Sequence, residues 1–78
     1  MENSRIEEIV EMFVVTFKKE NSEAYVYTAR GDGTFEKVTL HDRGDSTTAT
    51  SISETDYLKE TRNAMNDPDK RIHYHINS

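Results

Sequence analysis

The sequence predicts a small α+β domain in which two helices pack on one face of a three- to four-stranded, mainly antiparallel sheet. Three observations predict it: alternating segments on both sides of Asp32-Gly33, helix-capping patterns at Ser4 and Ser53, and a polar–apolar alternation over 70–76. Together they give the order α-β-β-β-α-β. We expect one domain spanning 1–78, because 78 residues suffice for a single core.

The first element is expected to be a helix from Arg5 to Lys19. Ser4-Arg5-Ile6-Glu7 matches the capping box, and apolar residues follow at helical spacing, at Ile6, Ile9, Val10, Phe13 and Phe17. The β-branched and aromatic content of Met12–Lys19 also allows a strand. We expect the helix. The helix would place Val15 on an acidic outer face with Met12 at its edge, so either a partner covers both residues or the helix prediction is partly wrong.

A β-hairpin is expected over Glu23–Asp42, closed by the two residues Asp32-Gly33. An Asp-Gly pair suits a type I′ turn, in which both central residues have positive φ. This turn sets a register in which Tyr27 faces Val38 and Tyr25 faces Leu40. The two tyrosines are therefore expected to point into the core.

The second half predicts a strand or loop, a helix and a final strand. Ser46–Ile52 is rich in Thr, which favours a third strand, but its weak alternation also allows a polar loop. Ser53 begins the second helix, which ends before Pro68. Lys70–Ile76 alternates as a strand. The expected buried stripe of the helix is Tyr57, Leu58, Thr61, Ala64 and Met65.

The composition excludes several classes of function. The net charge is −5, the mean hydropathy is −0.88 and there is no cysteine, which excludes disulfides, thiolate metal sites and thiol nucleophiles. No apolar run approaches the roughly 20 residues that span a bilayer, and the first residues do not resemble a secretion signal. We therefore expect a cytoplasmic protein that is not an enzyme and takes no cofactor or metal.

Three short patterns resemble known functional motifs but also have simpler structural explanations. Arg-Gly-Asp occurs at 30–32 and at 43–45, where Gly and Asp suit the expected turns. Gly31-Asp32-Gly33 lacks the third Gly and the helix of a nucleotide-binding loop. The pair His73 and His75, with His41 on the hairpin, leaves a histidine metal site open as a second alternative function.

The acidic runs Glu7-Glu8-x-x-Glu11 and Glu54-x-Asp56, in a short chain without cysteine, resemble those of small acidic proteins that bacteriophages encode to block host factors, including DNA mimics. The resemblance implies an inhibitor acting in the host-cell cytoplasm. The expected order helix, three strands, helix also resembles that of double-stranded-RNA-binding domains. Here, however, the last helix begins Glu54-Thr55-Asp56-Tyr57, which repels phosphate.

We therefore expect a non-enzymatic protein-binding module, an acidic inhibitor or DNA mimic that occupies a basic site on a nucleic-acid-binding protein. The residues expected to contact the partner are Glu7, Glu8, Glu11, Glu54, Asp56 and Glu60. A homodimer is expected through Met12, Val15 and Ile76. The alternative is a nucleic-acid-binding domain whose basic outer face comprises Arg30, Phe35, Lys37, His41, Arg71, His73 and His75.

Overall fold

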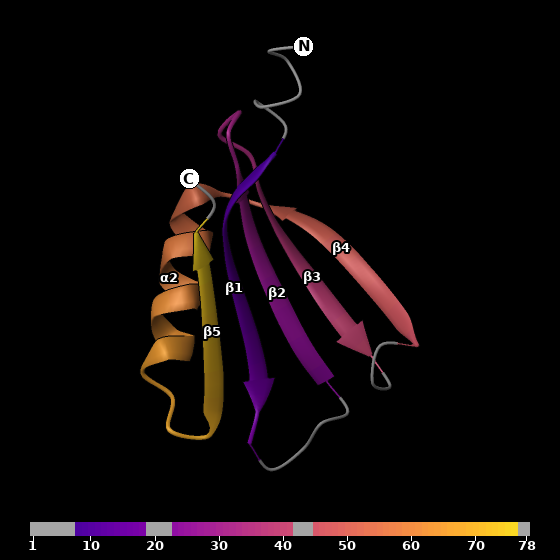
Figure 1. Ribbon diagram of the computed structural model, residues 1–78, viewed down its shortest axis with the longest axis vertical. Coiled ribbons are helices and arrows are strands. Elements are labelled where there is room, and N and C mark those ends of the chain that lie inside the picture. The colour runs from indigo at the N-terminus through magenta and orange to yellow at the C-terminus, as the bar shows by residue number, and fades with distance from the viewer. Residues whose placement is uncertain (1–7, 19–22, 42–44, 77–78) are drawn as a thin grey trace.

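The computed structural model describes residues 8–18, 23–41 and 45–76, which form a five-stranded antiparallel sheet and one helix. The small α+β class is confirmed, with the order β-β-β-β-α-β in place of the expected one. The elements are β1 (Ile9–Phe17), β2 (Glu23–Arg30), β3 (Phe35–His41), β4 (Ser46–Ile52), α2 (Glu54–Met65) and β5 (Lys70–Ile76). The spatial strand order is β4-β3-β2-β1-β5, so β4 and β5 are the two edges (Figure 1).

The predicted first helix is wrong, because its described part is the strand β1. This strand lies between β2 and β5, and both of its faces carry apolar residues. An almost continuously apolar run satisfies helical spacing by chance, and its β-branched content (Val10, Val14, Val15, Thr16) is the better guide. The order is therefore not that of a double-stranded-RNA-binding domain. The Ser4–Glu7 capping box lies outside the described residues.

The β2–β3 hairpin exists, but its register differs from the prediction by one residue. Tyr27 pairs with Lys37 and Tyr25 with Thr39. The Gly33 N–H donates to the Arg30 carbonyl (3.1 Å), and the Arg30 N–H donates to the Thr34 carbonyl (3.0 Å). With φ of +88° at Gly33, this is a three-residue loop with a bulge at the glycine. The one-residue shift moves Val38 and Leu40 to the opposite face from the tyrosines.

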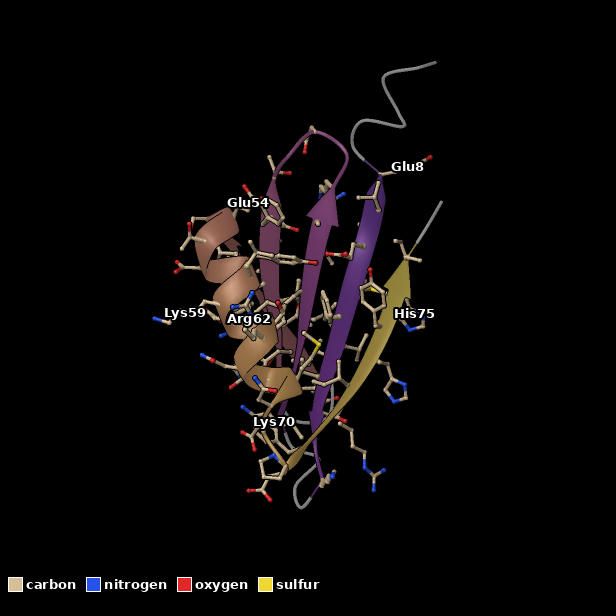
Figure 2. The ribbon with its side chains drawn as sticks, turned by 90° about the vertical axis from the view of Figure 1, so that its left-hand side faces the viewer. Glu8, Glu54, Lys59, Arg62, Lys70 and His75 are labelled. Atoms are coloured by element: carbon tan, nitrogen blue, oxygen red, sulfur yellow. The ribbon has the colours of Figure 1, made fainter. Side chains whose placement is uncertain are left out.

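The helix α2 packs on one face of the sheet, which we call the covered face (Figure 2). The buried core between α2 and the covered face consists of Phe13 and Val15 from β1, Tyr27 and Ala29 from β2, and Tyr57 and Ala64 from α2. Tyr25 is half-buried and packs against this core, so both tyrosines of β2 do point inward, as predicted. Aromatic contacts dominate: the ring centroids of Phe35 and Tyr57 lie 4.7 Å apart.

The start and end of α2 follow the sequence signals. The Ser53 hydroxyl accepts a hydrogen bond from the Asp56 N–H (3.1 Å), and Asn66 ends the helix before Pro68. Its buried stripe is narrower than predicted. Tyr57, Thr61 and Ala64 are buried, whereas Leu58 and Met65 are 51% and 53% exposed.

Candidate protein-binding surfaces

The predicted contact residue Glu11 is a structural residue of the covered face. The Tyr57 hydroxyl donates to one of its carboxylate oxygens (2.7 Å), and the Tyr74 hydroxyl donates to the other (2.8 Å). Burial, together with this hydrogen bond to a carboxylate, raises the pKa of Tyr57 far above its ordinary value of 10.0. The carboxylate thus joins β1, α2 and β5.

Glu60 is also engaged within the chain. Its Oε1 accepts hydrogen bonds from the Tyr27 hydroxyl (2.9 Å) and the Lys37 ammonium (3.2 Å). Partial burial opposes ionisation of Glu60, but the two hydrogen bonds outweigh it and hold its pKa below the usual range. This ion pair links α2 to β3. Glu11 and Glu60 are therefore poor candidates for an outer contact surface.

The exposed carboxylates gather at one end of the molecule, which we call the acidic end: Glu8 before β1, Asp32 in the β2–β3 turn, and Glu54 and Asp56 at the start of α2. The Gly31 N–H donates to the Glu8 carbonyl (3.0 Å), which places Glu8 beside the turn. Figure 2 shows Glu8 and Glu54 at this end. At the same end Arg30 pairs with Glu36 (3.5 Å). Of the predicted contact residues, Glu8, Glu54 and Asp56 share one end, and Glu7 lies outside the described residues.

The opposite end carries charges of both signs. Lys18 follows β1, Asp45 precedes β4, and Lys70 begins β5, where it pairs with Asp67 (3.3 Å). The Lys18 N–H donates to the Asp69 carbonyl (2.8 Å), which holds these segments together. The charge of the described chain is therefore asymmetric along the strands, with the negative excess at the acidic end.

The second face of the sheet, which we call the open face, has an aliphatic centre, and no element of the described chain packs on it. The strand registers place Val14, Val26, Val38 and Ala49 directly opposite one another across four strands. Met12 and Leu40 lie on the same face in neighbouring rows. These side chains are half-buried, except for Ala49, which is exposed. A contiguous apolar surface of this kind is typical of interaction sites.

The predicted dimer residues do not form one surface. Val15 is 1% exposed and lies in the core under α2, so its assignment to an interface is wrong. The error follows from the helix prediction, which turned Val15 outward. Met12 is half-buried on the open face, and Ile76 at the end of β5 is 66% exposed.

The alternative nucleic-acid face is divided between the two faces of the sheet. Phe35, Lys37 and His41 lie on the covered face, where Lys37 pairs with Glu60 and packs over the Tyr25 ring. Arg71, His73 and His75 lie on the open face, because they pair with Thr16, Val14 and Met12 of β1. Arg30 lies on the same face, because it alternates along β2 with Val26. One nucleic-acid strand cannot contact both sets at once.

A pocket of about 220 Å³ lies between α2 and the sheet, lined in part by Tyr25, Lys37, Glu60 and Lys70. Its lysines already have carboxylate partners, which leaves little charge to hold a ligand. Among the described residues, no three His, Asp or Glu side chains gather in a way that could hold a metal ion. The described helix is too short and too polar to span a membrane.

Comparison with protein-family models, with curated proteins and with solved structures gave no match. The two surfaces must therefore be interpreted from their chemistry. Sequence reasoning found the acidic residues but missed the open face. The signal for it was present: in β1 both alternate sets, Phe13, Val15 and Phe17 on one side and Val10, Met12 and Val14 on the other, are apolar. This pattern indicates a strand with apolar surroundings on both faces.

Proposed function

We propose that this chain is a non-enzymatic protein-binding module that docks on a basic, nucleic-acid-binding partner and so acts as an acidic inhibitor or DNA mimic. The observation that carries the proposal is the open face. Its aliphatic rows offer a surface for a partner to cover, and burial of apolar area is the main source of affinity in protein association.

The acidic end supplies the charge preference of this surface. It adjoins the open face at the β2–β3 turn, where Asp32 is exposed and Glu36 faces the same side as Val38. Charged groups at the rim of an interface mainly raise the association rate and exclude partners of the wrong sign. A net charge of −5 gives the same preference at longer range. The partner is therefore expected to carry an apolar patch with basic residues on the side that meets the acidic end, away from Arg71, His73 and His75 of β5.

The proposal is tested by capture of bacterial proteins on the immobilised chain, followed by mass spectrometry and elution with duplex DNA. We expect basic nucleic-acid-binding proteins that duplex DNA releases. Val14→Thr with Val38→Thr should abolish capture, because hydroxyls replace methyl groups on the open face while the β-branched shape is kept. Glu8→Lys with Glu54→Lys should reduce capture and flatten its salt dependence.

The matched control is Asp45→Lys with Asp69→Lys at the opposite end, which changes the net charge by the same amount. It should leave capture close to that of the original chain. If both charge variants weaken capture equally, only net charge matters and the acidic end is not a contact surface. If capture survives the open-face substitutions, or if only acidic proteins are retained, the proposed function is wrong.

A further inference from the structure

The two edges of the sheet differ in how well they are protected against pairing with another strand. Edge strands are commonly blocked by charged side chains, proline, bulges or short length. The β5 edge carries Lys70, Arg71, His73 and His75. The β4 edge, STTATSI, has seven residues without a charge or a proline, and its pairing with β3 has no register shift. The β4 edge therefore lacks these protections.

The backbone groups that β4 leaves free can be assigned from the hairpin. Arg30 is hydrogen-bonded across to Thr34, so by alternation Val26 and Val38 form a hydrogen-bonded pair of β2 and β3. The N–H and C=O of Val38 thus point to β2, and its opposite neighbour Ala49 points away from β3. The same holds for Thr47 and Ser51. The three alternate residues Thr47, Ala49 and Ser51 therefore present their backbone donors and acceptors at the outer edge.

We propose that a second copy of this chain pairs with β4 in an antiparallel arrangement, with the two-fold axis at Ala49. This register pairs all seven residues of the strand and directs every free backbone group to a matching one. Ala49 meets its own copy, and Thr47 meets Ser51 of the other chain. On the other side of the strand Thr48 meets Thr50, a favourable cross-strand pair.

The occupant is assigned as a second copy because the strand is complementary to itself in backbone hydrogen bonding and carries no charged side chain. Two chains of net charge −5 repel each other over most of their surface, and the β4 edge brings no charge from the strand into the contact. Antiparallel pairing also sends the two acidic ends to opposite ends of the assembly. The two-fold axis is perpendicular to the sheet, so the open faces of the two chains lie on the same side of the dimer and form one surface. The dimer therefore presents two copies of the proposed partner site.

The first test measures mass against concentration by sedimentation equilibrium. We expect a species of twice the 9.0 kDa chain mass. Ala49→Pro removes a donor that faces solvent in the single chain, so the fold is kept, whereas dimerisation should weaken by at least about tenfold. Ile76→Pro places the same ring on the β5 edge and should leave the dimer intact. A monomer at all concentrations, or a dimer that only Ile76→Pro disrupts, overturns the proposal.

The second test uses the absence of cysteine from the chain. Under mild oxidation Ala49→Cys should form a covalent dimer, because paired Cα atoms about 5.5 Å apart can be bridged. Thr47→Cys alone should not, since the two thiols lie roughly 13 Å apart along the strands. A mixture of Thr47→Cys and Ser51→Cys should cross-link again. Self-linking of Thr47→Cys or Ser51→Cys would contradict the register. Loss of the dimer leaves capture by a single chain measurable, so the two proposals can fail separately.

Discussion

The two faces of the sheet differ in the kinds of side chain that they carry and in whether the helix covers them. The covered face is built from aromatic side chains whose hydroxyls reach carboxylates, as Tyr57 reaches Glu11 and Tyr27 reaches Glu60. The centre of the open face is built from aliphatic side chains, which have no hydrogen-bonding groups. One helix about 10 Å wide cannot cover five strands that together span about 19 Å. Tyrosine suits positions at the margin of the area that α2 covers, because its ring is buried while its hydroxyl meets a polar group.

The proposed function places stability and binding on opposite sides of the same strands. Adjacent residues of β1 belong to different surfaces: Val15 is in the core and Val14 is on the open face. Substitutions on the covered face should therefore unfold the chain, and those on the open face should alter binding with little loss of stability.

Tyr57→Ala should give the largest effect. Tyr57 is 1% exposed and contacts the rings of Phe13, Tyr27 and Phe35. Loss of a buried aromatic side chain costs about 3–5 kcal/mol, which approaches the whole stability of a small domain. Urea unfolding followed by circular dichroism measures it. Leu58→Ala, at the half-exposed neighbour, should stay within about 0.5 kcal/mol. Equal losses at both positions would mean that α2 is not packed as described.

Alkaline pH should destabilise the covered face. Burial and hydrogen bonds to carboxylates raise the pKa of both Tyr27 and Tyr57 above the ordinary value of 10.0. A group whose pKa is raised on folding contributes stability that is complete below its unfolded pKa and is lost as the pH rises through the folded value. The free energy of unfolding should therefore fall above about pH 10.

Tyr57→Phe separates this effect from the deprotonation of lysines. Removal of the hydroxyl deprives Glu11 of a hydrogen bond, which costs about 1.5–3 kcal/mol at neutral pH because the acceptor is charged. The variant should also lose less stability than the original chain between pH 9 and pH 11. Parallel pH profiles for the two chains would contradict this role of the hydroxyl.

Val15→Thr and Val14→Thr form a matched pair across the sheet. The substitutions have the same shape and the same chemistry, and only the face differs. At Val15 the new hydroxyl is buried without a partner and should cost about 1–3 kcal/mol. Val14 is half-buried on the open face, where no described element covers it, so the change in stability should be about 0.5 kcal/mol or less. Chemical denaturation of both variants measures the difference. If Val14→Thr is as costly as Val15→Thr, the open face is covered in solution.

The sequence predicted α2, the hairpin and β5, because caps, turn residues and strict alternation are local signals. It failed at β1, where the choice between strand and helix depends on β2 and β5, which lie far away in the chain. The misplacement of Val15 and the separation of Glu11 from the other carboxylates follow from that one error. The one-residue register shift has a different origin. Gly33 adopts the positive φ of a three-residue loop, which the Asp32-Gly33 pair alone does not distinguish from a two-residue turn.

Of the candidate surfaces, the acidic end was predictable in composition but not in position. Glu54 and Asp56 lie at a helix start and were placed correctly, whereas Glu8 joins them only because the β2–β3 turn holds the start of β1. The open face depends on the register of four strands, which no single segment encodes. The unprotected edge of β4 could be read from its composition, but only once its place at the end of the sheet was known.

Among the substitutions of buried residues, Thr28→Val should give the smallest change, and it should be a gain. Thr28 lies on the open-face side of β2, is 4% exposed, and its hydroxyl has no hydrogen-bond partner among the described residues. Replacement of an unpaired buried hydroxyl by a methyl group should raise the free energy of unfolding by about 1 kcal/mol. Thr61→Val is the matched control, because the equally buried Thr61 hydroxyl donates to the Tyr57 carbonyl (2.7 Å) and its loss should destabilise. Opposite signs for the two variants in thermal unfolding would confirm that the Thr61 hydroxyl is paired and the Thr28 hydroxyl is not. A loss of stability in Thr28→Val would show that the Thr28 hydroxyl has a hydrogen-bond partner in solution. The two buried hydroxyls would then not differ in hydrogen bonding.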